Sequence, residues 1–391
     1  MTTRRDVLRT GTALLAVVVA GCIGTAREPN AADGSVQWDH RFTDRRVSQF
    51  RRVLRATDGG FFALGSTAAS DQRAGEGFVV RTDDDGTEQW RLSVPQVALL
   101  LDAVETPDGG LVAVGNATTR GPYLDGWAVG ITPDGTERWH RELSTDGLSD
   151  LTVVDSLPDG GFLLGGGHGS PDGARSAWLV TVEGDGSVRR DVADAVPGVG
   201  GPIRAVVSTD DGLVLAGATG DGTANGLLAD VAADGSVRWT RVLDTGVTGV
   251  LAAGDGYVLS SAHYMDVTMP RLTKVDSEGA VIWSYGYTPV DAELWFSGEA
   301  LEADTDGGYL LAGFTQRWDD PSSATRPTVA KVSADGATVE WARSYGDGGS
   351  VHSVVALDDD YALGGMIEND ARLLRFEAPT SSDVSLRVLS V

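Results

Sequence analysis

The sequence predicts an all-β protein, a β-propeller of seven four-stranded antiparallel blades, on the strength of two repeated signatures and one unpaired strand. The first signature is a DGG or related turn followed by an apolar strand that ends at glycine, as in "DGGFFALGS". Its seven copies start at residues 58, 108, 159, 210, 254, 306 and 358, about 50 residues apart, which is a repeat period typical of propeller blades.

The second signature is a DG turn followed by a strand with a central tryptophan. Six copies hold Trp38, Trp90, Trp139, Trp239, Trp283 and Trp341. In the remaining copy, "GDGSVRRDV", Arg190 stands in the tryptophan position. Equal spacing predicts that these indole rings pack between blades and do not contact a ligand. Arg190 indicates either a degenerate blade or a charge that faces solvent.

Residues 99–143 show how one unit divides into four strands. "LLLDAVETP", "LVAVGN", "WAVGIT" and "ERWHREL" are apolar or alternating runs, separated by a DGG turn, a polar loop and a DG turn. Glycine and aspartate suit tight hairpins because they tolerate positive φ. In the fourth strand alternate residues are apolar, which predicts one face packed on a neighbouring sheet. Sustained helical periodicity is absent after the first segment of the chain.

The chain begins with the last strand of its own repeat. Residues 35–42 carry the second signature with no unit before them, and the final unit supplies only three strands. We therefore expect the N-terminal strand to be the outer strand of blade seven, which closes the ring and removes an exposed edge. An alternative is that the tail "DVSLRVLSV", residues 383–391, supplies this strand and the N-terminal segment forms a cap.

The N-terminal residues resemble an export signal. "TRRDVLR", residues 3–9, resembles a twin-arginine signal and precedes an apolar run too short to span a bilayer. "VAGC" then resembles a lipobox, and Cys22 is the only cysteine. These features predict a signal peptide over residues 1–21, a lipidated tether over 22–34, the propeller over 35–378 and a C-terminal tail over 379–391. The predicted location is the extracellular face of the cytoplasmic membrane.

Composition excludes one class of partner. The formal net charge is −25, and Lys274 and Lys331 are the only lysines. Such a negative field repels nucleic acid and anionic lipid. Abundant carboxylates with few lysines also indicate a high-salt organism, in which salt screens the repulsion between like charges. The alternative is an ordinary acidic protein that uses arginine in place of lysine.

The repeats resemble the WD40-like and quinoprotein-like (PQQ-like) β-propellers of secreted lipoproteins, particularly those of haloarchaea. The resemblance covers roughly residues 33–378 and implies a fold, not an activity. Quinoprotein enzymes hold a pyrroloquinoline cofactor over calcium, usually have eight blades, and many have a vicinal disulfide. This chain has seven units and one cysteine, so we expect no such cofactor.

Catalytic and metal-binding motifs are not apparent. The five histidines are scattered along the chain at His40, His140, His168, His263 and His352. "TDDDGTE", residues 82–88, resembles a calcium loop but falls at a hairpin turn that every unit needs, so we interpret it as a turn. A GxSxG nucleophile motif is absent. The sequence thus predicts no catalytic residues and no metal ligands.

The candidate binding residues are large aromatics in the long segments that join second to third strands and blade to blade. They are Tyr123, Tyr264, Tyr287, Trp295 and Trp318. Loops on a rigid ring are where binding residues gather, and Arg317, Asp319 and Asp320 would form a polar rim around Trp318. The alternative is that each aromatic packs locally on its own blade. "NAT" at Asn116 is a glycosylation sequon, expected in a surface loop.

These observations predict a non-catalytic, lipid-anchored binding or assembly platform with a protein or small-molecule partner. The alternative is a propeller enzyme (a hydrolase, a lyase or a quinone-dependent dehydrogenase) with its site over the central channel. A deep channel with converging carboxylates would favour the enzyme, and a surface with aromatic patches would favour partner binding.

Overall fold

The computed structural model describes residues 36–42, 47–68, 75–120, 123–144, 147–169, 175–193, 195–196, 200–209, 211–219, 225–232, 236–265 and 267–391. The predicted signal peptide, the lipobox with Cys22 and the tether lie outside these ranges. Within them, no helix is long and apolar enough to cross a membrane.

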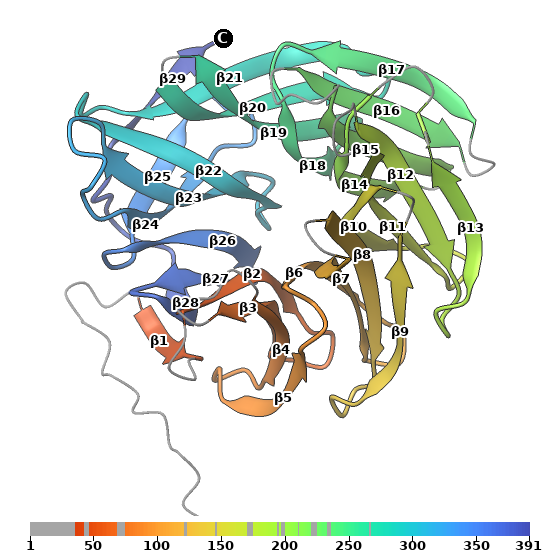
Figure 1. Ribbon diagram of the computed structural model, residues 1–391. Coiled ribbons are helices and arrows are strands. Elements are labelled where there is room, and N and C mark those ends of the chain that lie inside the picture. Colours follow the sequence, from red (N-terminus) through yellow and green to blue (C-terminus); the bar gives the residue numbers. More distant parts are fainter. Residues whose placement is uncertain are drawn as a thin grey trace, which may run out of the picture.

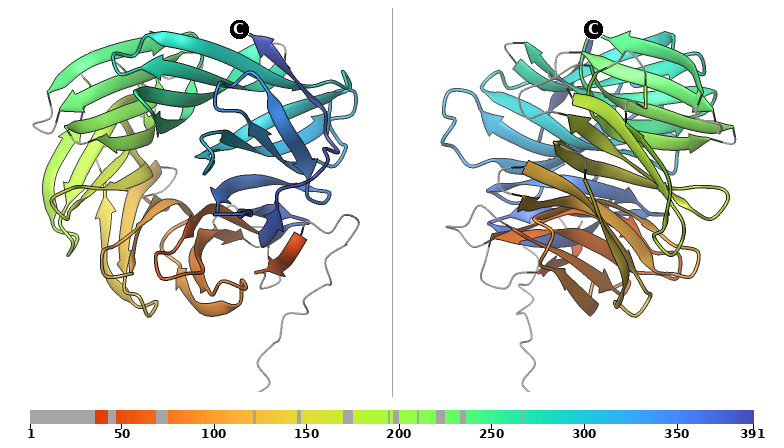
Figure 2. Two further views of the ribbon diagram at one scale, coloured as in Figure 1. Left: turned by 180° about the vertical axis from the view of Figure 1, so that it is seen from behind. Right: turned by 45° about the vertical axis from the view of Figure 1, so that its right-hand side comes forward.

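The described chain forms seven antiparallel sheets arranged as a ring (Figure 1), and the turned views show the blades stacked side by side around it (Figure 2). Blade one comprises β2 (Val47–Arg55), β3 (Phe61–Ala68), β4 (Glu76–Thr82) and β5 (Glu88–Val94). Blade two comprises β6 (Leu99–Glu105), β7 (Leu111–Arg120), β8 (Tyr123–Ile131) and β9 (Glu137–Leu143). Blade three comprises β10 (Leu148–Ser156), β11 (Phe162–Gly169), β12 (Arg175–Val182) and β13 (Val188–Ala193). Blade four comprises β14 (Ile203–Thr209), β15 (Gly212–Ala218), β16 (Gly226–Ala232) and β17 (Val237–Leu243). Blade five comprises β18 (Val247–Ala253), β19 (Gly256–Met265), β20 (Val267–Asp276) and β21 (Val281–Pro289). Blade six comprises β22 (Leu294–Ala303), β23 (Tyr309–Arg317), β24 (Arg326–Val332) and β25 (Val339–Ser344). Blade seven comprises β26 (Gly349–Ala356), β27 (Asp360–Ile367), β28 (Asp370–Glu377) and β1 (Val36–Arg41), and β29 (Leu386–Ser390) is a further strand.

The N-terminal strand closes the last blade, as predicted. β1 pairs antiparallel with β28, from Val36 opposite Phe376 to Arg41 opposite Arg372. Phe42 follows β1 and is buried, and its N–H donates to the carbonyl of Ala371 at 2.9 Å. The two ends of the ring are thus joined by a ladder of backbone hydrogen bonds.

The alternative role for the tail is wrong. β29 pairs antiparallel with β21, so the tail adds a fifth strand to the outer edge of blade five. Leu386 and Val388 pack on the core layer that contains Tyr287. This pairing covers an edge that would otherwise expose unpaired backbone groups.

Two hairpins are longer than the sequence indicates. β7 and β8 continue pairing as far as Arg120 opposite Tyr123, and β19 and β20 as far as Met265 opposite Val267. The segments expected as loops between second and third strands are therefore mostly strand in blades two and five. The assignment ended these strands too early because the residues there lack an alternating apolar pattern, although their backbone pairing continues.

The core consists of layers between neighbouring blades, and the repeat tryptophans lie in these layers. Trp90 and Trp139 each reach the DG turn of the next blade, where Nε1 donates to the carbonyl of Pro133 at 2.9 Å and of Gly184 at 3.0 Å. The turn glycines Gly135 and Gly186 have positive φ, and a Cβ on either would lie 2.5 Å from the ring. The prediction of inter-blade packing is confirmed.

Arg190 does not mark a degenerate blade. Blade three has all four strands, and Arg190 pairs opposite Thr181 in β12 as Trp139 pairs opposite Gly130 in β8. Its side chain is exposed, as the second interpretation of this residue expected.

Candidate functional site

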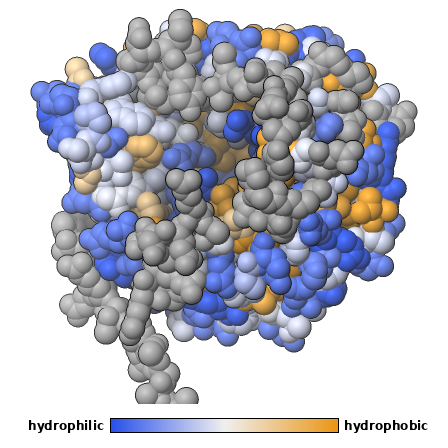
Figure 3. Space-filling view, in the orientation of Figure 1, coloured by the Kyte–Doolittle hydropathy of each residue, from blue (hydrophilic) through white to orange (hydrophobic). Residues whose placement is uncertain are grey.

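The first strands of the blades surround a central channel with a volume of about 690 Å³. In the orientation of Figure 1 the visible surface is mainly hydrophilic, and hydrophobic residues show in the hollow at the centre of the ring (Figure 3). Five carboxylates line the channel: Asp102, Glu105, Asp155, Glu299 and Glu302. Carboxylates that converge in a channel are the feature that the sequence analysis gave as favouring an enzyme.

Two of these carboxylates join neighbouring blades. Asp102 Oδ2 accepts a hydrogen bond from the Val154 N–H at 3.0 Å, and Asp155 Oδ2 accepts from the Ser208 N–H at 3.0 Å and its hydroxyl at 2.7 Å. Arg52 Nε lies 3.3 Å from Asp102 Oδ1. Burial raises the pKa of Asp102, and it also raises the pKa of Glu302, in both cases against the opposing charge of Arg52. These contacts hold the blades together and leave the two aspartates with structural partners.

Glu299 belongs to a different arrangement. His352 Nδ1 lies 2.5 Å from Glu299 Oε2 and donates to it, and Arg51 Nη1 lies 4.0 Å from the same oxygen. Burial opposes ionisation of Glu299, but the hydrogen bond and charge of His352 and the charge of Arg51 outweigh it and lower its pKa. His352 Nε2 is buried and has no hydrogen-bond partner among the described residues. With a neutral imidazole, this pair would have the chemistry of a general base oriented by a carboxylate.

The five predicted aromatic residues are not brought together as one surface. Tyr287 is fully buried in the layer between blades five and six, and its hydroxyl donates to the Gly336 carbonyl at 2.8 Å. Its assignment to a binding face is therefore wrong, because β21 runs on to Pro289 and keeps this ring inside. Tyr123 and Tyr264 lie in strands β8 and β19, and their side chains lie outside the described part of the structure.

Trp295 and Trp318 do lie together. Their ring centroids are 5.9 Å apart, and Phe314 packs edge-on against Trp295 at 5.2 Å. We call Trp295, Phe314 and Trp318 the blade 6 aromatic patch. Trp318 is 40% exposed, so the patch reaches the surface at the end of the ring that carries the β23–β24 loop. Sequence reasoning missed Phe314, which fits the alternating pattern of β23 and gave no separate signal.

Charged residues that contact one another flank Trp318. Arg317 donates to both oxygens of Asp319, at 3.0 and 2.9 Å, and to Glu293 Oε2 at 2.6 Å. These hydrogen bonds raise the pKa of Arg317, and that of Asp319 is lowered. Asp320 instead accepts from the Ser322 N–H at 3.0 Å and shapes the loop. The predicted rim is present at Arg317 and Asp319, and Asp320 is part of a turn.

A groove between blades six and seven adjoins the patch. It has a volume of about 470 Å³, and Phe314 lines it together with Met366 and Glu368. Phe314 thus belongs to both the patch and the groove. A ring stack beside an apolar groove can hold an extended or aromatic partner group.

The remaining predicted positions have structural roles. Asn116 lies in β7, not in a surface loop; it is 7% exposed, and its Oδ1 accepts from the Leu151 N–H at 3.0 Å. The expected loop is therefore wrong, because the sequon pattern carries no information on burial.

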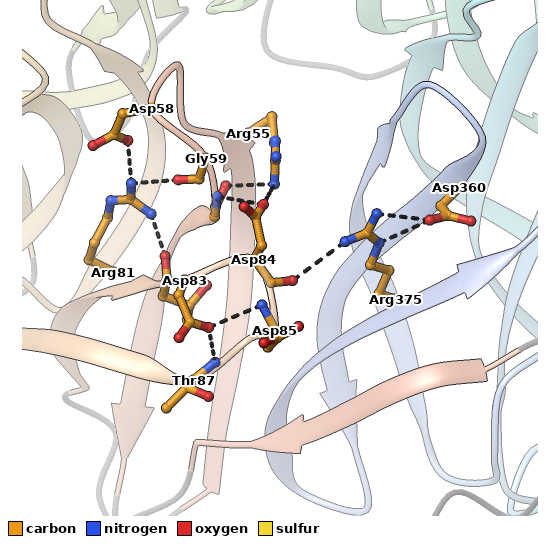
Figure 4. A network of polar contacts seen from close by, with 12 residues as sticks. Arg55, Asp58, Gly59, Arg81, Asp83, Asp84, Asp85, Thr87, Asp360 and Arg375 are labelled. Carbon is orange, nitrogen blue, oxygen red and sulfur yellow. Dashed lines mark hydrogen bonds and ion pairs between the residues drawn. The ribbon is translucent and has the colours of Figure 1, made fainter.

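Residues 82–88 form a turn, as interpreted (Figure 4). Asp83 Oδ1 accepts from the N–H groups of Asp85 and Thr87, and Asp84 Oδ1 pairs with Arg55 at 2.5 Å. The hydrogen bond from the Gly60 N–H has the largest effect on Asp84, and together with Arg55 it lowers the pKa of this carboxyl. Among the residues that the structure describes, no three His, Cys, Asp or Glu side chains gather closely enough to hold a metal ion.

Comparisons with known proteins do not place this chain in a family. No family model matches the chain, and no curated protein matches it. Solved structures similar to it include Sqt1 from Chaetomium thermophilum, with 14% identity, 86% of this chain and 97% of that chain covered and a TM-score of 0.49. BamB from Moraxella catarrhalis is 11% identical, the match covers 88% of this chain and 97% of that chain, and the TM-score is 0.45. A protein of unknown function from Bacteroides caccae is 14% identical, the match covers 64% of this chain and 86% of that chain, and the TM-score is 0.42.

Proposed function

We propose that this protein is a non-catalytic, lipid-anchored binding or assembly platform that holds its partner at the blade 6 aromatic patch. The exposure of Trp318 beside Trp295 carries the proposal, because large aromatic anchors in a fixed geometry supply most of the binding energy of many interfaces. The bidentate Arg317–Asp319 pair and the Glu293 contact hold the anchor before the partner arrives. A prearranged anchor loses little side-chain entropy on binding.

The surroundings of the patch indicate the chemistry of the partner. Glu293, Asp319 and Asp320 surround Trp318, and the chain as a whole has a formal charge of −25. A partner with a basic rim and an apolar or aromatic centre would complement this surface. In concentrated salt the charged contacts are screened over a few ångströms, so the apolar contact would dominate the affinity.

We predict that Trp318→Ala weakens partner binding by about 2 kcal/mol or more, as for other interface hot spots, while the melting temperature stays almost unchanged. The partner is isolated by affinity purification from native membranes, identified by mass spectrometry, and titrated as a purified protein. Ile282→Ala is the matched control, because Ile282 is 54% exposed on β21, away from the patch. A large fall in melting temperature with binding intact would assign Trp318 to the packing of its own blade.

Membrane attachment rests on the sequence around Cys22. We predict that Cys22→Ser releases the protein from the membrane, because in this proposal a lipid on the Cys22 thiol attaches the protein to the bilayer. Changing Arg4 and Arg5 to Lys should trap the precursor in the cytoplasm, since twin-arginine export requires that pair. Cell fractionation and immunoblotting measure both effects. A cleaved Cys22→Ser chain that remains with the membrane would contradict the anchor.

One observation supports the second candidate function, an enzyme with its site over the central channel. Among the described residues His352 Nε2 has no hydrogen-bond partner, and Glu299 contacts the ring at Nδ1. A hydrolase or lyase could use this nitrogen as a base. An activity that His352→Ala removes and Trp318→Ala leaves intact would favour this function over the platform.

A further inference from the structure

The junction between blades three and four contains a cavity of about 360 Å³. It lies where the repeat has lost its tryptophan, and Arg190, in that position, is one of the residues that line it. Leu163 and Leu179 of blade three and Leu213 and Val231 of blade four form much of its wall.

The other junctions show what normally occupies this space. In five of them an indole ring packs on the turn glycine of the next blade, where an added Cβ would approach a ring atom to between 2.5 and 2.9 Å. The pairs are Trp38 with Gly86, Trp90 with Gly135, Trp139 with Gly186, Trp239 with Gly279 and Trp283 with Gly336. An indole-sized aromatic group is therefore the filling that this architecture accepts.

At the blade 3–4 junction the core layer lacks that ring. Leu157, Val192 and Leu213 pack against the layer but are only partly buried. The wall is mostly apolar, although Asp159, Thr181 and Thr209 also line it, and a cavity of about 150 Å³ is enough to bind benzene. The volume here therefore has room for two fused rings with a small substituent.

Arg190 adds a preference for a flat, electron-rich ring. In blades two and four an arginine lies over the repeat tryptophan: the guanidinium carbon of Arg141 is 5.8 Å from the Trp139 ring centroid, and that of Arg241 is 5.7 Å from Trp239. A guanidinium within about 6 Å of an aromatic face is attracted to it. In blade three the position of these arginines holds Val192, and Arg190 takes the tryptophan position itself, so its guanidinium would meet a ring in the cavity from the wall that it lines.

We propose that the blade 3–4 cavity binds a small planar aromatic molecule of indole-like chemistry, in the position that a tryptophan side chain occupies at the other junctions. This site is separate from the blade 6 aromatic patch, and the platform function can fail without affecting it. The internal repeat explains why the cavity exists, and its apolar wall and arginine define the ligand class.

Titration of 5-fluoroindole against the full chain, followed by ¹⁹F NMR, tests the proposal. We expect one saturable site with a Kd on the order of 0.1–1 mM, typical of a ligand with so few heavy atoms. Arg190→Trp should supply the missing ring, weaken 5-fluoroindole binding at least about tenfold, and raise the melting temperature. Val192→Phe fills the cavity from the same strand and serves if Arg190→Trp does not fold.

Val242→Trp is the matched control, because it adds an indole at a 62% exposed position of β17 outside the cavity wall. Binding should persist in this variant. Failure of 5-fluoroindole to saturate the wild-type chain within its solubility would overturn the proposal. Undiminished binding in a folded Arg190→Trp or Val192→Phe variant would overturn it as well.

Discussion

Deletion of residues 36–42 should prevent the chain from folding as a closed monomeric ring. These residues pair with β28, bury Phe42, and supply Asp39, whose carboxylate makes a bidentate pair with Arg372. Losing a buried phenylalanine costs about 3–5 kcal/mol, and breaking a buried ion pair costs about the same. The sum approaches the 5–15 kcal/mol by which most domains are stable. Size-exclusion chromatography and a circular-dichroism melt should show aggregates with no cooperative transition.

Deletion of residues 386–391 is the matched control for this experiment. It removes β29, which is also an edge strand, but blade five keeps its other four strands and the ring stays closed. We expect a soluble monomer with a melting temperature lowered by a few degrees. Asp39→Ala gives a milder version of the first deletion, because it removes only the carboxylate that makes the bidentate pair with Arg372. Equal losses of stability in the two deletions would contradict the closing role of β1.

The sequence could predict the blades and their closure because both depend on local, repeated requirements. A turn glycine with positive φ and a tryptophan that packs on it recur at five of the junctions between blades, as Gly135 and Trp90 do. The unpaired first strand could be placed because only one unit lacked its fourth strand. Counting the strands of each repeat was therefore sufficient to predict the number of blades and the strand that closes the ring.

The tail carries no such signature, and its position depends on a surface that only the folded ring presents. β29 pairs with β21 because that edge is open and because Leu386 and Val388 meet an apolar layer there. Tyr287 was misassigned for the same reason. Its burial follows from the packing between blades five and six, which no local pattern of residues records.

The channel group was also beyond sequence reasoning. His352, Glu299 and Arg51 come from blades seven, six and one, and His352 and Arg51 are separated by 301 positions. Their contact is created by the ring closure. Trp295 and Trp318 could be connected because they flank one hairpin, whereas Phe314 was hidden within an ordinary strand pattern.

Lys331→Met should be among the most destabilising single substitutions in the chain. Lys331 Nζ lies 2.7 Å from Asp304 Oδ2, 2.5 Å from Asp306 Oδ2 and 3.4 Å from Glu340 Oε2. Burial opposes the charge on Lys331, but hydrogen bonds to Asp304 and Asp306 outweigh it and raise its pKa. Tyr361 also donates to Asp304 at 3.0 Å, so this network links blades six and seven.

The loss arises from the charge that remains. The Asp304 side chain is only 2% exposed, and without Lys331 its carboxylate would be buried with hydrogen bonds alone. Removing one partner of a buried ion pair costs about 3–5 kcal/mol. Urea denaturation should therefore show a lower midpoint with an unchanged slope. Adding Asp304→Asn to Lys331→Met removes the orphaned charge, and we expect the double variant to recover part of the lost stability.

Lys274→Met provides the matched control, because the only two lysines of the chain occupy the same repeat position. Lys274 lies opposite Trp283 as Lys331 lies opposite Trp341, but Lys274 donates to the Ala253 carbonyl and burial lowers its pKa. Replacing Lys274 leaves no buried carboxylate behind, so we expect its denaturation midpoint to stay close to that of the wild type. Equal midpoints for Lys274→Met and Lys331→Met would mean that the loss comes from the lysine position opposite tryptophan and not from Asp304. That result would remove the ion network as the link between blades six and seven, and the apolar layer around Trp341 and Phe376 would have to hold them alone.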